Sequence, residues 1–211
     1  MPKTQLVSDE VYEKSFEACR FYIDNYCIWR SKNGETIPAK ETGKSYRWQF
    51  YLRKALFEKR FISTFTHLFV YHIEKEIGHF DFQIAGLETA ATPLVSALPI
   101  TCQVLYNIDI NGFSVRKERK EYGLKNWIEG NFVPDKKVLI VDDLSASGNS
   151  IEKCYDILLE HNANVENFVF SCVDKMTSVE QERYGITLET NNKDNLKIIS
   201  PFNLDHFKLK E

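Results

Sequence analysis

The chain has 211 residues, of which 43% are hydrophobic and 27% are charged, and its formal net charge is −3. This length suits one globular domain, 1–211, with a full hydrophobic core, and the composition is typical of soluble proteins. The small net charge excludes a general attraction to nucleic acid or to an anionic membrane, so neither is expected as a partner and any basic site must be local.

The cysteines and the apolar runs indicate where the protein works. Five cysteines are spread along the chain without a C-x-x-C pair, a pattern that favours free thiols in a reducing compartment over disulfides or a zinc site. The N-terminal stretch has no apolar signal core, and no apolar run approaches the length needed to span a membrane. We therefore expect a cytoplasmic protein.

The first quarter of the chain is predicted to be helical or irregular. Ser8 precedes two acids and a helical apolar pattern, which predicts a helix over 9–27. The polar range 29–46 contains glycine and proline and predicts a long loop or an irregular hairpin. One or two amphipathic helices are expected over 52–78. Residues 1–53 would form a helical cap, or hood, beside the rest of the molecule.

From residue 80 onward, short apolar runs alternate with helical stretches. The predicted strands are 80–85, 101–106, 138–141, 165–173 and 197–199, and the predicted helices are 93–98 and 147–160. This alternation predicts an α/β fold, with a central mostly parallel sheet and helices on both faces. The polar, glycine-containing range 111–131 is expected to be a flexible loop.

The apolar run 138–141 ends at two adjacent acids, Asp142 and Asp143, and a loop with almost no side-chain bulk follows. That loop consists of Ser145, Ala146, Ser147, Gly148, Asn149 and Ser150. In a parallel sheet, ligands bind beyond the carboxyl ends of the strands, and main-chain amides at a helix start can hold a phosphate. The acids could accept hydrogen bonds from ribose hydroxyls, which predicts a sugar-phosphate site. The alternative is that the acids only end a strand and the serines only cap a helix.

The stretch 140–150 resembles the phosphoribosyl-pyrophosphate (PRPP) signature of the type I phosphoribosyltransferases. A second stretch, 116–123 (RKERKEYG), is similar to the flexible catalytic loop of the orotate phosphoribosyltransferases. The resemblance runs from about residue 80 to 175. It implies the type I phosphoribosyltransferase fold with an N-terminal hood.

The resemblance also implies an activity: Mg²⁺-dependent transfer of a phosphoribosyl group from PRPP to orotate, giving orotidine 5′-monophosphate and pyrophosphate. It implies Lys120, Lys117 and Asp143 as catalytic residues. The implied PRPP-binding residues are Arg116, Lys117, Lys120, Tyr122, Asp142, Asp143, Ser145, Ala146, Ser147, Gly148, Asn149 and Ser150. The two acids would bind the metal ion indirectly, through ribose and water.

Further parts of the site follow from the same resemblance. Glu88, Thr89 and Ala90 occupy the place of the family's pyrophosphate loop. A plain strand-to-helix turn would have the same local sequence pattern. The resemblance implies that Ala146 and Lys175 bind the base, together with either 42–46 or the earlier glycine turn 31–34. Because the family's catalytic loop crosses into a neighbouring subunit, a homodimer with shared active sites is implied.

Three residues depart from the family pattern. Tyr122 stands where the catalytic loop usually has His, Ala90 where many members have Lys, and Ala146 where Thr is common. These departures leave two alternatives open: a PRPP- or nucleotide-binding regulatory protein with weak or no activity, and a transferase for another base. Retention of Lys117 and Lys120 favours an enzyme, since a sensor has less need of a cationic loop.

Overall fold

The computed structural model describes residues 5–38, 45–119, 126–175 and 196–209. The helices are α1 (Asp9–Tyr26), α2 (Arg53–Leu56), α3 (Lys59–Glu76), α4 (Thr92–Tyr106) and α5 (Asn149–Glu160), with a short 3-10 turn, η1 (Leu204–His206). The strands are β1 (Ile28–Arg30), β2 (Ile37–Pro38), β3 (Ser45–Tyr46), β4 (Trp48–Phe50), β5 (Gln83–Leu87), β6 (Gly112–Val115), β7 (Ile128–Gly130), β8 (Val138–Ser145), β9 (Val165–Asp174), β10 (Lys197–Ile199) and β11 (Phe202–Asn203).

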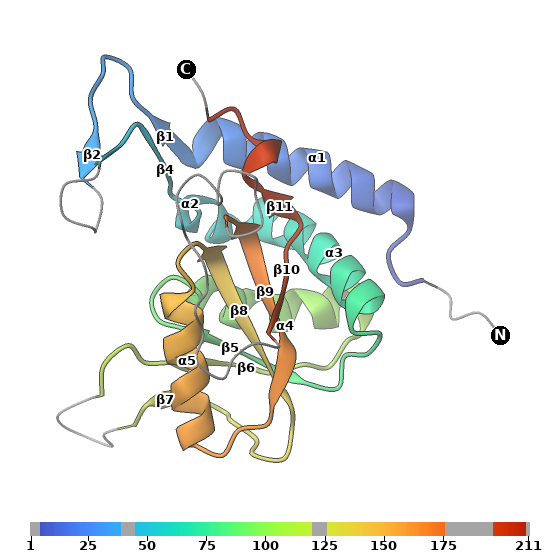
Figure 1. Ribbon diagram of the computed structural model, residues 1–211. Coiled ribbons are helices and arrows are strands. Elements are labelled where there is room, and N and C mark those ends of the chain that lie inside the picture. Colours follow the sequence, from blue (N-terminus) through green and yellow to red (C-terminus); the bar gives the residue numbers. More distant parts are fainter. Residues whose placement is uncertain (1–4, 39–44, 120–125, 176–195, 210–211) are drawn as a thin grey trace.

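A seven-stranded sheet forms the centre of the molecule, in the order β10-β9-β8-β5-β6-β7, with β11 also paired to β9 (Figure 1). Its strands pair in parallel except for β6 and β7, which are antiparallel. The predicted α/β class with a mostly parallel sheet is therefore confirmed. The strand predicted at 197–199 is present as β10.

Both faces of this sheet are buried, which explains why its central strand is an uninterrupted apolar run. Along β8, Leu139 and Val141 face the core shared with α1, α3 and α4, whereas Val138 and Ile140 face the core shared with α5. Successive side chains of a strand point to opposite faces, so one run supplies both cores. Figure 1 shows α5 on one side of the sheet and α3 and α4 on the other.

The N-terminal part forms the predicted helix and two small antiparallel strand pairs. The Ser8 Oγ accepts a hydrogen bond from the Val11 N–H at 3.3 Å, which caps α1 as the sequence predicted. α1 packs along α3. In the range 29–46, predicted as a loop or irregular hairpin, β2 pairs with β3, and β1 pairs with the later strand β4.

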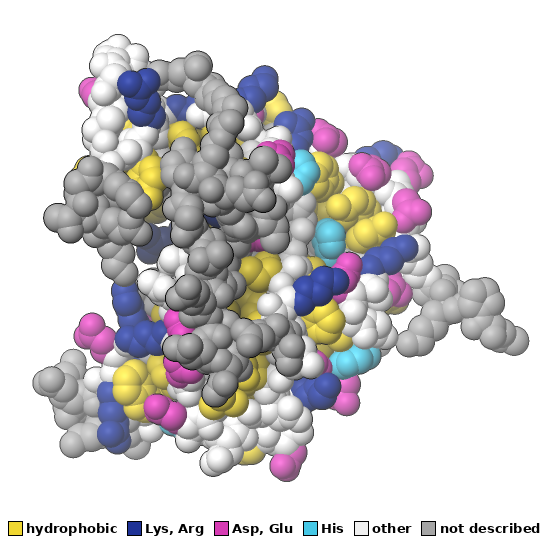
Figure 2. Space-filling model, viewed as in Figure 1, with side chains coloured by type: hydrophobic (Ala, Val, Ile, Leu, Met, Phe, Trp, Pro, Cys, Tyr) yellow, Lys and Arg dark blue, Asp and Glu magenta, His cyan; other side chains and the backbone are white. Residues whose placement is uncertain are grey.

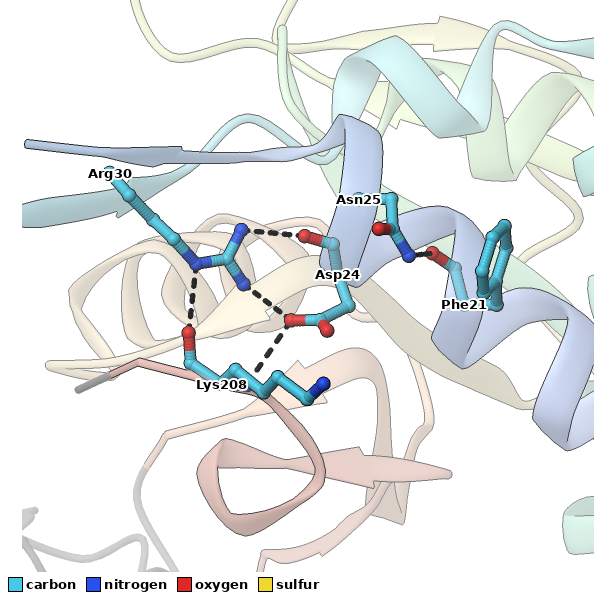
Figure 3. Close-up of polar contacts among 5 residues, drawn as sticks. All are labelled: Phe21, Asp24, Asn25, Arg30 and Lys208. Atoms are coloured by element: carbon cyan, nitrogen blue, oxygen red, sulfur yellow. Dashed lines mark hydrogen bonds and ion pairs between the residues drawn. The ribbon is translucent and has the colours of Figure 1, made fainter. Parts of the chain in front are cut away.

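A cluster of polar contacts joins the end of α1, β1 and the C-terminal segment (Figure 3). Arg30 forms an ion pair with the Asp24 carboxylate and donates to the Asp24 carbonyl oxygen at 2.6 Å and to the Lys208 carbonyl oxygen at 2.8 Å. The Lys208 N–H donates to Asp24 Oδ1 at 3.2 Å. These contacts, here called the Arg30 cluster, hold the last described residues against the hood.

Residues 101–106 and the range 111–131 differ from the sequence predictions. Residues 101–106, predicted as a strand, are the second half of α4, where Leu94, Leu98 and Cys102 are buried at helical spacing. The β-branched residues of this stretch favour a strand, but packing against the sheet stabilises a helix here. The range 111–131 is not a loop throughout, because β6 and β7 pair with each other. Phe113 and Val115 are buried and alternate with less buried residues, the period of a strand.

The surface carries charges of both signs. Figure 2 shows Lys and Arg side chains interspersed with Asp and Glu over α1 and α3 on the face that is visible there. Within the described ranges, no helix is both long and apolar enough to cross a bilayer.

Candidate functional site

The two acids lie inside β8, and the strand continues beyond them to Ser145. The prediction that the strand ends before the acids was therefore wrong. Strand β9 continues the ladder, because Asp142 pairs with Ser171 and Ser145 with Asp174. Asp142 is only 5% exposed as a result.

Burial dominates the electrostatics of this acid pair. The Asp143 N–H donates to Asp142 Oδ1 at 3.0 Å. Burial raises the pKa of Asp142 well above the usual carboxyl range, and the neighbouring charge of Asp143 raises it further. Burial also raises the pKa of Asp143, while the positive charge of Arg53 opposes that shift. Arg53 was not predicted from the sequence, because no local pattern links the start of α2 to β8.

The loop after the acids leads directly into α5. Gly148 has a φ of 76° and is the N-cap of α5, which has no side-chain cap hydrogen bond. A residue with a Cβ would adopt this left-handed conformation at a cost. Because no side chain caps the first turn, its main-chain amides can bind an anion. Ser147, Asn149 and Ser150 are exposed here, and Ala146 is half-buried.

Ser145 differs from the other hydroxyl residues of this loop. It is 1% exposed, its Oγ donates to Asp174 Oδ1 at 2.7 Å, and its N–H donates to Ser171 Oγ at 3.0 Å. Its side chain therefore ties β8 to β9 within the protein. The Ser145 hydroxyl and N–H are therefore both engaged in hydrogen bonds within the protein.

The residues Glu88, Thr89 and Ala90 connect β5 to α4. The Glu88–Thr89 peptide bond is cis. Just before them, Gly86 comes so close to its neighbours that an added Cβ would lie 2.3 Å from Ala91 Cβ and 2.7 Å from the Val141 carbonyl oxygen. Glycine at this position therefore lets the turn approach β8 closely.

The described part of the cationic loop begins where β6 ends. Arg116 lies 3.3 Å from Glu129 Oε1 and 3.9 Å from Glu88 Oε2, and the Lys117 N–H donates to Glu88 Oε1 at 3.2 Å. This part of the loop thus contacts the β5–α4 turn directly. Lys120 and Tyr122 lie outside the described residues.

Lys175 follows β9 and faces two aromatic rings of the hood. Its Nζ lies 5.0 Å from the centroid of the Trp48 ring and 5.8 Å from that of Tyr46, within the range of cation–π attraction. Its N–H donates to the Ser145 carbonyl oxygen at 2.8 Å, so the main chain also holds it beside the loop of α5. Of the two hood stretches considered for the base, the one ending at Tyr46 reaches this position.

Sheet topology brings all these groups to one edge. Because β9, β8, β5 and β6 are parallel neighbours, their carboxyl ends lie side by side. These ends lead to Lys175, to the loop of α5, to the β5–α4 turn and to Arg116. One edge therefore combines an acid pair, of which Asp142 is buried and Asp143 is half-buried, with an uncapped helix start and cations. This combination is suited to a phosphorylated sugar.

The chain is similar in sequence to known phosphoribosyltransferases. Residues 81–206 match the phosphoribosyl transferase domain. The chain is 25% identical over 195 residues to the orotate phosphoribosyltransferase of Methanococcus maripaludis, covering 92% of this chain and 96% of that protein. It is 32% identical over 152 residues to the orotate phosphoribosyltransferase of a Bradyrhizobium species, covering 70% of this chain and 80% of that protein.

Solved structures support the same fold. An orotate phosphoribosyltransferase of Mycobacterium tuberculosis, crystallised with Fe(III) dicitrate, superposes with a TM-score of 0.68 at 20% identity and covers 91% of this chain and 98% of its own. The same enzyme in complex with PRPP gives a TM-score of 0.61 at 20% identity, covering 95% and 93%. The fold is therefore that of the type I phosphoribosyltransferases, and the chain belongs to the phosphoribosyl transferase family, as an enzyme similar to the orotate phosphoribosyltransferases.

Proposed function

We propose that this enzyme transfers the 5-phosphoribosyl group of PRPP to orotate, giving orotidine 5′-monophosphate and pyrophosphate. The observation that carries the proposal is the meeting of the acid pair Asp142 and Asp143 with the uncapped start of α5 at one edge of the sheet. An anion-binding helix start beside hydrogen-bond-accepting carboxylates suits a sugar phosphate better than a phosphate alone.

In the proposed complex, the 5′-phosphate lies against the main chain of 146–150 and the hydroxyls of Ser147 and Ser150. Asp142 and Asp143 accept hydrogen bonds from the ribose hydroxyls. Ser145 acts indirectly, because its buried hydroxyl bonds Asp174 and so fixes where the loop leaves the sheet. Asp143 is also proposed to stabilise the positive charge that develops on the ribose ring in the transition state.

The diphosphate leaving group is proposed to lie between the pyrophosphate loop 88–90 and the cationic loop. Arg116, Lys117 and Lys120 would neutralise the charge that grows on it, and Tyr122 would donate a hydrogen bond. Ala90 supplies only its main-chain amide, so the cations of 116–120 carry more of this task than in members with Lys at that position. Exclusion of water by this loop would protect the activated sugar from hydrolysis.

The acid pair also fits a magnesium ion. Mg²⁺ prefers carboxylate oxygens and usually keeps several waters and substrate phosphates as its other ligands. The carboxyl pKa values of Asp142 and Asp143 are raised, so their ionised forms are unfavourable in the protein alone. A bound cation would stabilise these ionised carboxylates. These two residues would hold the ion through water and the ribose hydroxyls. When bound, it would supply positive charge next to the leaving group.

The base is proposed to lie between Ala146 and Lys175, beside the aromatic residues of the hood. Lys175 is held over Trp48 and Tyr46, and these rings would let a planar base stack next to the ammonium group. An anionic base such as orotate would gain a charge-assisted contact from Lys175. A neutral base would not.

We further propose a homodimer, formed through α4. None of the 15 residues of this helix (TPLVSALPITCQVLY) is charged. Its exposed side is apolar, because Ile100 and Val104, one helical turn apart, are 65% and 76% exposed. A surface helix usually has a charged outer side, and an exposed apolar side indicates an interface. A cytoplasmic location is proposed as well, since all five cysteines are free and buried.

An acceptor panel tests the transferase proposal. The protein is incubated with Mg²⁺ and PRPP and with orotate, uracil, adenine or hypoxanthine in turn, and pyrophosphate and nucleotide are measured. Of the four bases, we expect only orotate to react, with release of pyrophosphate and formation of orotidine 5′-monophosphate. The double variant Asp142→Asn/Asp143→Asn should be inactive, and Asp135→Asn, which changes an exposed acid, should be fully active.

The departures at Ala90, Tyr122 and Ala146 define the alternatives to this reaction. Tight PRPP binding in calorimetry without pyrophosphate release for any base would favour a PRPP-binding regulatory protein. Release with a base other than orotate would reassign the acceptor while keeping the transferase.

A further inference from the structure

Glu88 connects the pyrophosphate loop to the start of the cationic loop by three contacts. Its N–H donates to the Val115 carbonyl oxygen at 2.8 Å. Its Oε1 accepts from the Lys117 N–H at 3.2 Å, and its Oε2 lies 3.9 Å from Arg116 Nη1. One side chain therefore binds both the main chain and a cation of the stretch 116–119.

The Arg116 side chain is held from several sides. Its Nη1 lies 3.3 Å from Glu129 Oε1 on β7, and its Nε donates to the Glu118 carbonyl oxygen at 3.2 Å. Its main-chain N–H donates to the Trp127 carbonyl oxygen at 2.8 Å. The Arg116 and Glu88 side chains are only 23% and 30% exposed, so their attraction is screened less than that of a fully exposed pair.

A carboxylate at position 88 is unfavourable for binding an anion at this turn. In the proposed function, the turn 88–90 receives an anionic diphosphate, and a negative charge there opposes its binding. The contacts of Glu88 are with the cationic stretch, which must itself lie close to the leaving group. A carboxylate at this place is useful if it fixes the direction in which that stretch leaves the sheet.

We propose that Glu88 is a positioning residue that anchors the stretch 116–119 to the pyrophosphate loop and thereby places its cations for the leaving group. The inference deepens the proposed transferase function and rests on it. Displacement of a catalytic cation by about 1 Å can lower a rate by up to about a hundredfold, so loss of the anchor should affect turnover more than nucleotide binding.

Limited trypsin digestion tests the anchor without any assay of activity. Within this stretch, trypsin can cleave after Arg116, Lys117 and Arg119, and mass spectrometry measures the cleavage rate at each bond. Without its contacts to Glu88, the stretch should open more often, so Glu88→Ala should raise cleavage there about fivefold. Glu88→Gln, which keeps an oxygen for the Lys117 N–H but loses the charge facing Arg116, should give a smaller rise.

Two further variants serve as controls. Asp109→Asn removes an exposed acid just before β6, at the opposite end from the anchor, and should leave cleavage unchanged. Glu129→Gln removes the second carboxylate that faces Arg116 but leaves the contact between Glu88 and the Lys117 N–H. Its effect on cleavage should therefore resemble that of Glu88→Gln.

Kinetics then separate positioning from a merely structural role. Glu88→Ala should lower kcat about tenfold, while the affinity for orotidine 5′-monophosphate, which has no diphosphate, and the melting temperature should stay unchanged. Equal cleavage of Glu88→Ala and the unaltered protein, or an unchanged kcat, would overturn the inference. If Glu88→Ala does not fold, Glu88→Gln decides by the same measurements. Should no base support turnover, the digestion still tests the anchor, so the two proposals can fail separately.

Discussion

At the scale of the residue, Asp142 shows a conflict between stability and binding. Its carboxyl group is buried in β8 next to a second acid, and its pKa is raised. An unfolded aspartate ionises near pH 4, so the folded protein holds a proton that the unfolded chain releases. The contribution of this carboxyl group to the free energy of unfolding is therefore fully present below pH 4 and is lost as the pH rises through the raised pKa. Such a site is unfavourable for folding alone, and a bound cation or ribose would compensate for it.

This conflict predicts the behaviour of Asp142→Asn. The amide keeps an oxygen for the Asp143 N–H but cannot ionise, so the variant should be more stable than the unaltered protein at pH 9, by about 1.4 kcal/mol or more. The difference should shrink at pH 5, and PRPP should bind less tightly. Denaturant unfolding at both pH values measures the first effect and calorimetry the second. Asp135→Asn controls for net charge, and a difference that does not depend on pH would contradict the account.

At the scale of the element, the Arg30 cluster joins α1, β1 and the C-terminal segment. The Asp24 side chain is 11% exposed, so removing Arg30 leaves a largely buried carboxylate with fewer partners. We expect Arg30→Ala to lower the free energy of unfolding by about 1–3 kcal/mol. Arg20→Ala is the matched control: it removes an ion pair with the more exposed Glu17 and should cost less than about 1 kcal/mol. Equal losses would show that the cluster contributes no more than a surface pair.

At the scale of the whole molecule, the apolar side of α4 predicts self-association. A charge at Ile100 and at Val104 would have to be buried in an interface without a partner, so Ile100→Glu/Val104→Glu should halve the mass measured by light scattering. Leu159→Glu, on the exposed side of α5, should not change the mass. An unaltered protein that is already monomeric would exclude the dimer, and a dimer in the double variant would place the interface elsewhere.

Much of the fold could be predicted because its signals are local. The cap at Ser8, the apolar run that became β8 and the pattern of α5 each depend on residues within a few positions of one another. The prediction failed where local preference and packing disagree. In 101–106, β-branched residues favoured a strand, but burial of Leu98 and Cys102 required a helix. The acids at 142 and 143 suggested the end of a strand, but pairing with β9 extended it.

The α/β class, the order of most elements and the resemblance to the phosphoribosyltransferases follow from the amino-acid sequence, because periodicity and contiguous motifs depend on neighbouring residues. Folding alone brings together residues that are distant in the sequence. Lys175 lies over Trp48, Glu88 contacts Arg116, and the charge of Arg53 acts on Asp143. These meetings depend on which strands become neighbours in the sheet and on which edge their ends share. No spacing along the chain contains that information.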